Sequence, residues 1–227
     1  MSLQNTARRR RIIHLPGYCR GEERMNMVTH IIGAGLGLVA LLACVVVAAF
    51  NQSVVGVVTA MIYGFSVILL FTMSSIYHGL HIGLPKKVFR ILDHCTIFVL
   101  IAGTYTPILL NEFRVARPVD AWVLFGVIWG MAVLGIVMKA IFINRFKVVS
   151  IVLYLLLGWA ALFRLGPMIE VLGAPFFVLL LTGGGLYTLG VAFYIAGRKK
   201  KYMHSVFHLF VVAASILHSV AIAVFIL

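Results

Sequence analysis

Long apolar runs fill most of the chain, and short polar or charged breaks separate them. Each run is long enough to cross a bilayer as a helix, which takes roughly 20 residues. The breaks are Asn51-Gln52, Gly83–Lys87, Asn111–Pro118, Asn144-Arg145, Gly166-Pro167 and Gly197–Lys201. The predicted spans are 27–50, 53–80, 89–110, 119–142, 147–166, 173–196 and 203–226. We therefore expect an all-α membrane protein, with a seven-helix bundle over residues 27–227 and a polar, basic segment over residues 1–26.

The composition supports this class. Hydrophobic residues make up 63% of the chain and charged residues 11%, with a mean hydropathy of +1.10. A soluble domain would carry about 25% charged residues. The three cysteines show no paired spacing, so we expect free thiols. The polar residues before the first apolar run also predict that no secretory signal peptide is present.

The basic residues predict the orientation of the bundle. The net charge of +13 comes from residues in the breaks, and the positive-inside rule accounts for them without nucleic acid, so we expect no nucleic-acid partner. Sixteen Lys and Arg residues fall on the side of the amino terminus, and three fall on the other side. The three are Arg114, Arg117 and Arg164. This bias predicts a cytoplasmic amino terminus and an extracytoplasmic carboxy terminus.

Histidines gather at the predicted cytoplasmic ends of the spans. His204 and His208 open the last span one helical turn apart, a spacing that lets two imidazoles hold one metal ion. Two histidines at a helix start can also simply face lipid headgroups. The His-Glu-x-x-His motif of zinc proteases is also incomplete, because residue 205 is a serine. His78 closes span 2 at matching depth and is our candidate for a third ligand; His81 competes but lies nearer the loop, and we interpret it as interfacial. Three histidines and a water would form a catalytic zinc site.

Asp93 is the carboxylate that we expect beside these histidines. It could orient or deprotonate a water at the metal, with Ser74 one turn below His78 as a further polar partner. The alternatives for Asp93 are a residue favoured by the helix dipole and a surface ion pair with Arg90 or Lys87.

The remaining histidines receive no ligand role. We expect His94 to point elsewhere, His30 to be a hydrogen-bonded structural residue and His14 to have no function. His218 lies about 15 Å beyond His208 along the predicted helix.

Four short motifs occur in order at the ends of the predicted spans. They are Glu23-x-x-Asn26-x-x-Thr29-His30-x-x-Gly33, Ser74-x-x-x-His78, Leu92-Asp93 and His204-x-x-x-His208. These motifs resemble those of the hemolysin III family, the bacterial branch of the progestin and adipoQ receptor group, over about residues 20–227. The stretch Ala102–Pro107 favours the bacterial branch.

The resemblance implies seven helices and a zinc ion (Zn2+) bound by His78, His204 and His208 on the cytoplasmic side, with Ser74 and Asp93 beside the metal. It also implies a multi-pass protein of the bacterial inner membrane. Related members include adiponectin receptors and, more distantly, alkaline ceramidases, so the implied activity is zinc-dependent amide hydrolysis of a membrane lipid. Alternatives are a receptor-like sensor of membrane state with a structural zinc, and a lytic protein; the lack of a continuous polar stripe along any span argues against lysis. The pattern favours no particular oligomeric state.

The charge bias predicts the topology directly. A reporter fused after Leu227 should be extracytoplasmic, and one inserted in Gly197–Lys201 should be cytoplasmic, because basic residues are retained on the cytoplasmic side. Paired phosphatase and fluorescent-protein fusions measure this. A cytoplasmic carboxy terminus would contradict the seven-span orientation.

Overall fold

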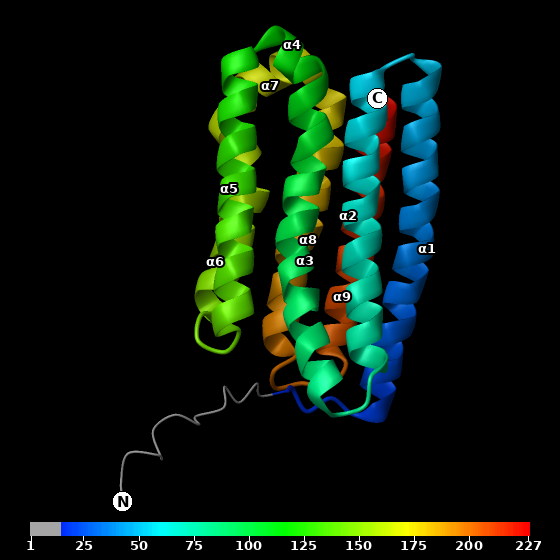
Figure 1. Cartoon of the computed structure of the whole chain (residues 1–227), viewed down its shortest axis with the longest axis vertical. Helices are drawn as coiled ribbons and strands as arrows, with labels where there is room; N and C mark the ends of the chain where they lie inside the picture. The colour runs from blue at the N-terminus through cyan, green and yellow to red at the C-terminus, as the bar shows by residue number, and fades with distance from the viewer. Residues whose placement is uncertain (1–14) are drawn as a thin grey trace, which may run out of the picture.

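The computed structural model describes residues 15–227, which form a bundle of helices with no strand in that range (Figure 1). The elements in order are α1 (Arg20–Phe50), α2 (Val54–Gly79), α3 (Leu84–Ile108), η1 (Leu109–Phe113), α4 (Arg114–Ala116), α5 (Pro118–Phe142), α6 (Lys147–Gly158), η2 (Ala160–Arg164), α7 (Leu165–Leu172), α8 (Ala174–Ala196) and α9 (Met203–Phe225). Seven helical stretches in this range are long and apolar enough to cross a membrane, with α3 to α4 and α6 to α7 each counting as one. The seven-span prediction is therefore confirmed.

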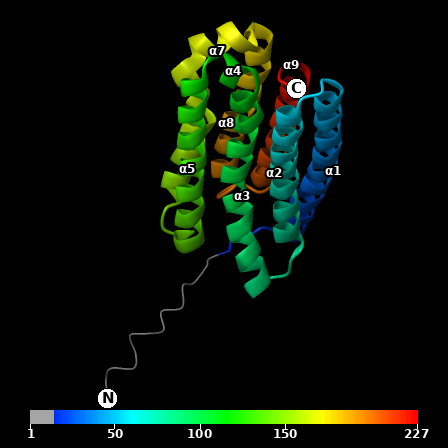
Figure 2. The ribbon, with the colours of Figure 1, turned by 45° about the horizontal axis from the view of Figure 1, so that its top comes forward.

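The last helix closes the bundle beside the first. Helix α9 packs between α1 and α8, while α2 packs between α1 and α3, and α3 also contacts α5 (Figures 1 and 2). The starts of α1, α3, α6 and α9 and the ends of α2, α5 and α8 meet at the lower end of the bundle in Figure 1. We call this the histidine end, and it is the end that the charge bias predicts to be cytoplasmic.

Two helices begin earlier than their hydropathy indicates. Helix α1 starts at Arg20 instead of residue 27, because the Glu22 carboxylate accepts a hydrogen bond from the backbone of Cys19 (2.9 Å) and acidic groups are favoured in a first turn. Helix α3 starts at Leu84 instead of residue 89, with Pro85 in its first turn. Lys86, which we predicted to lie in a loop, is consequently a buried helical residue.

The predicted turn at Gly166-Pro167 is wrong. The stretch that starts at Lys147 continues to Leu172, and the chain reverses at Gly173, where φ is +81°. Pro167 sits in the first turn of α7, where its missing N–H is not needed. The Tyr105 hydroxyl supports the break between α6 and α7: it donates to the Gly158 carbonyl and accepts from the Ala161 N–H, both at 2.9 Å.

The outer end of α3 is distorted around Pro107. Beyond Pro107 the chain forms the π-helical turn η1, and Asn111 leaves helical geometry (φ −93°, ψ −123°). The Asn111 side-chain amide donates to Thr59 Oγ1 (3.0 Å) and to the Pro107 carbonyl (2.8 Å), so the altered turn is tied to α2.

Glycines bring α1 close to α2. A Cβ on Gly33 would lie 2.7 Å from the Phe71 ring, and one on Gly37 would lie 2.9 Å from Val67. Gly35, in contrast, has open space around it. Because Phe71 packs edge-on against His30 (5.0 Å between ring centroids), this close approach helps to position the histidines.

Candidate metal centre

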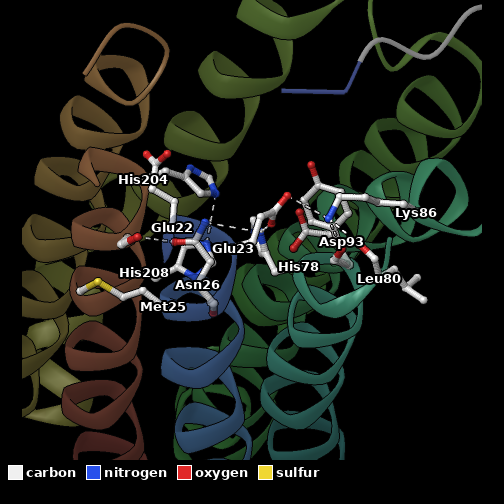
Figure 3. Close-up of polar contacts among 12 residues, drawn as sticks. Glu22, Glu23, Met25, Asn26, His78, Leu80, Lys86, Asp93, His204 and His208 are labelled. Atoms are coloured by element: carbon white, nitrogen blue, oxygen red, sulfur yellow. Dashed lines mark hydrogen bonds and ion pairs between the residues drawn. The ribbon is translucent and has the colours of Figure 1, made fainter. Parts of the chain in front are cut away.

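Three buried imidazoles converge at the histidine end (Figure 3). His78 comes from the end of α2, and His204 and His208 come from the start of α9. One ring nitrogen of each lies within 4.8 Å of the other two, and His204 Nε2 is 3.1 Å from His208 Nε2. The structure thus brings together the three ligands suggested by spacing and depth. His81 is exposed and is not part of the group.

Hydrogen bonds fix the orientation of two of the three rings. His78 Nδ1 lies 2.6 Å from Glu23 Oε2, and His208 Nδ1 lies 3.2 Å from the Asn26 carbonyl oxygen. Both partners accept, so each histidine donates through Nδ1 and directs the lone pair of Nε2 at the cluster. Within residues 15–227, His78 Nε2 is buried without a hydrogen-bond partner. A metal ion is one group that would satisfy such a nitrogen.

The two closest donor nitrogens have a spacing that suits a transition-metal ion. Two nitrogens bound tetrahedrally at roughly 2.0–2.1 Å lie about 3.3 Å apart, close to the observed His204 to His208 separation of 3.1 Å. Imidazole nitrogens suit ions such as zinc, copper, iron and nickel. The three histidines could therefore hold one such ion.

Glu23 connects the histidine cluster to two other helices. Its second oxygen, Oε1, is 2.9 Å from Lys86 Nζ, and buried Lys86 also donates to the carbonyls of Tyr77 (2.9 Å) and Leu80 (3.0 Å) at the end of α2 (Figure 3). We expected Asp93 to be the only carboxylate near the cluster, and this was wrong. The helical spacing that places Glu23, Asn26 and His30 on one face could have identified Glu23 as a neighbour of the cluster.

Asn26 and Glu22 attach α1 to α9. Fully buried Asn26 accepts a hydrogen bond from Ser205 (2.5 Å) through its side-chain oxygen and one from His208 through its backbone carbonyl. Glu22 accepts from the backbone N–H of Tyr202 (2.7 Å), directly before α9 begins. The positions of both α9 histidines therefore depend on α1.

Tyr18 covers the cluster from outside the first helix. Its ring stacks on His204 (4.9 Å between centroids, 20° between planes) and lies 5.7 Å from His78. Burial raises the pKa of the Tyr18 hydroxyl above its usual value, so the group stays protonated at neutral pH.

Asp93 lies beside the cluster but not in it. Among the described residues, the set of mutually close ligand atoms contains only the three histidines, whereas Asp93 and Ser74 line the adjoining cavity and interact with each other. His94 Nδ1 is 3.1 Å from Asp93 Oδ2. The expectation that His94 points elsewhere is therefore wrong. The cavity spans more than one face of α3, so neighbouring side chains can both reach it.

His30 packs instead of forming hydrogen bonds. It stacks on His208 with ring centroids 3.7 Å apart, and neither of its ring nitrogens has a hydrogen-bond partner in the described part of the chain. The hydrogen-bonded role that we predicted is wrong. Deeper in the bundle, His218 Nε2 lies 3.1 Å from the Leu180 carbonyl oxygen. His14 lies outside the described residues.

A cavity of about 180 Å³ extends from the histidines into the bundle. Side chains of α3, α6, α8 and α9 form its walls, which are mostly apolar, and His218 lies at its deep end. Gly158 and Leu162 belong to the wall and are exposed, so the cavity reaches the outer surface beside α6. The polar residues Asp93, Ser74 and His94 lie near the histidines.

Comparison with known proteins identifies relatives over nearly the whole chain. The family model described as Haemolysin-III related matches residues 19–219, which include the whole candidate site. "Hemolysin-3" of Bacillus cereus is 39% identical over 194 residues (86% of this chain, 87% of that protein), and the "Hemolysin-3 homolog" of Bacillus subtilis (strain 168) is 37% identical over 194 residues (86% and 89%). The human "Monocyte to macrophage differentiation factor" is 30% identical over 171 residues (73% and 69%). No solved structure matches the chain.

The geometry predicts one bound metal ion per chain. Replacing His78, His204 or His208 singly with alanine should remove it, because each imidazole supplies one of three converging nitrogens. His81→Ala should retain the ion. Elemental mass spectrometry of the purified proteins measures the stoichiometry, and full metal content in His78→Ala would show that the third ligand is wrongly assigned.

Glu23 should control metal affinity without touching the metal. Glu23→Gln removes the charge that orients His78 and pairs with Lys86, so the affinity should fall roughly 10–100-fold. Competition with a chelator of known affinity measures this. The matched control is Glu170→Gln, because Glu170 contacts Arg117 in the opposite half of the bundle. Equal affinities for the two variants would contradict the role given to Glu23.

Proposed function

Because the chain belongs to the haemolysin-III-related family and gathers three buried imidazoles beside a carboxylate, we propose that it is a zinc-dependent hydrolase of a membrane lipid, acting on an amide bond in the inner membrane. The observation that carries this proposal is the arrangement of Asp93. A carboxylate next to three converging histidines, but outside their set, is the arrangement expected when one metal position is left for water. A structural zinc site normally has four protein ligands.

His78, His204 and His208 would hold the zinc. A zinc ion there supplies Lewis acidity at the scissile carbonyl and makes water a stronger acid. Glu23 and the Asn26 carbonyl keep the His78 and His208 rings in the tautomer whose Nε2 can bind metal.

Asp93 has the position of a general base. In amide hydrolysis it takes a proton from the attacking water while the water oxygen bonds to the carbonyl carbon. It then returns the proton to the nitrogen as the C–N bond breaks, so that a carboxylic acid and an amine leave. His94, 3.1 Å from the carboxylate, holds Asp93 in place, and Ser74 can donate a hydrogen bond to the reacting groups.

The cavity suits a lipid substrate. Its apolar walls can bury an acyl chain, and its exposed rim at Gly158 and Leu162 gives a chain access from the bilayer beside α6. The polar end of the substrate would then reach Asp93 and the histidines.

A non-enzymatic sensor with a structural zinc is the second candidate. The ligands and their partners connect α1, α2, α3 and α9, so a bound ion would stabilise the closed ring of helices. A protein of this kind would need no base at position 93.

Asp93→Asn separates the two functions. The substitution removes the proton acceptor but keeps the size of the side chain, so metal content and folding should persist while lipid hydrolysis falls about 100-fold or more. Lipid mass spectrometry of cells that express each variant identifies the lipid, and turnover by purified protein gives the rate. Asp120→Asn, at the Asp120–Arg164 ion pair away from the cavity, is the matched control.

The other outcomes are equally informative. Loss of both metal and folding in Asp93→Asn would indicate a closed structural site. Unchanged turnover would show that Asp93 is not the base.

A further inference from the structure

A buried lysine faces the cavity without a counter-charge. Lys139 lies on the inner face of α5, near the end of that helix, with only 4% of its surface exposed. It lines the same cavity as Asp93 and His94. Lys139 takes part in none of the ion pairs formed within residues 15–227. A buried charge in a membrane protein is costly unless a partner compensates it.

The surroundings of Lys139 are cationic. Arg90, Lys147 and Arg198 are the charged residues that act on its ammonium electrostatically, and Lys147 also lines the cavity. Arg90 is itself buried and donates to Asn144 (3.3 Å). Like charges close together raise the free energy of the ligand-free protein.

No carboxylate among the described residues forms an ion pair with Lys139. All six acidic residues of the sequence are described by the structure. Three belong to the half of the bundle that contains η1, α7 and the start of α5: Glu112, Asp120 and Glu170. The other three have other partners: Glu22 with Cys19 and Tyr202, Glu23 with His78 and Lys86, and Asp93, which lines the same cavity, with His94. Lys139 therefore has no directly paired counter-charge among the described residues.

The positive-inside rule alone does not explain this lysine. That rule describes residues that reach water or headgroups at the membrane surface, and long side chains normally extend there. Lys139 instead continues the buried stripe of Ala132 and Gly135, which packs against α3. Its burial beside an open cavity indicates a binding group.

We propose that Lys139, together with Lys147, binds a phosphate group of the ligand that occupies the cavity. This proposal deepens the proposed function and rests on it for the identity of the ligand as a substrate: the lipid would carry a phosphate, and its anionic group would sit at Lys139 while its scissile bond lies at Asp93. A lysine ammonium group suits a phosphate, which it contacts as a point charge.

The test is a binding measurement that needs no turnover. Metal-loaded protein in neutral detergent is heated with dioleoylphosphatidic acid, with inorganic phosphate or with dioleoylglycerol, and the unfolding midpoint is recorded. Saturating phosphatidic acid should raise the midpoint of the native chain by about 5 °C, and dioleoylglycerol should not. An equal rise with inorganic phosphate would identify free phosphate as the source, whereas a rise with phosphatidic acid alone would identify the lipid.

The key variant is Lys139→Met, which keeps the length of the side chain and removes its charge. Without ligand it should be at least as stable as the native chain, because an unpaired buried charge is gone. The shift caused by the phosphate ligand should disappear. Lys199→Met, an exposed lysine at the same end, is the matched control and should keep the shift.

Three results would overturn the proposal: no shift with either phosphate ligand, the same shift in Lys139→Met, or an equal shift with dioleoylglycerol. If Lys139→Met does not fold, Lys139→Gln replaces it in the same test. Native mass spectrometry of phosphatidic acid bound to the native chain then measures the binding directly. Metal content is measured in parallel. Phosphate binding without hydrolysis of any amide-containing membrane lipid would defeat the proposed function and leave the phosphate site standing.

Discussion

The histidine end depends on the interactions of the half-buried carboxylate of Glu23. It accepts from His78 with one oxygen and pairs with Lys86 through the other, so a single side chain of α1 is joined to α2 and α3. In a low-dielectric interior each of these groups would be costly alone, and together they compensate one another. The same lysine satisfies the last carbonyls of α2, which keeps His78 at the correct height.

The cavity lining changes from polar beside the candidate metal centre to apolar towards the middle of the bundle. Charged and titratable groups are concentrated where α2 ends and α9 begins, and the walls become apolar towards the centre of the bundle. His218 is the exception, since it contacts the Leu180 carbonyl at the deep end. Gly183 makes that contact possible, because a Cβ there would lie 2.5 Å from His218 Nε2.

Hydropathy predicted the number of spans because a bilayer imposes a minimum length on every apolar run. It did not predict the helix starts at Arg20 and Leu84, which depend on capping by Glu22 and on Pro85, and it misplaced the turn that occurs at Gly173. The three candidate metal ligands could be predicted from their spacing and depth. The contact of His94 with Asp93 was not, because it depends on side-chain conformation and on the shape of the cavity.

The hydrogen bonds between α1 and α9 also constrain when the site can assemble during synthesis and membrane insertion. Asn26 holds Ser205 and His208 across 179 and 182 residues of sequence, so the binding centre cannot exist until the final helix has left the ribosome and entered the bilayer. Contacts of such separation form late, after the loop that they close has been synthesised. Acquisition of the ion would then be the last step of maturation, and a chain cut short before α9 would be recognisable to quality control as one that never matured.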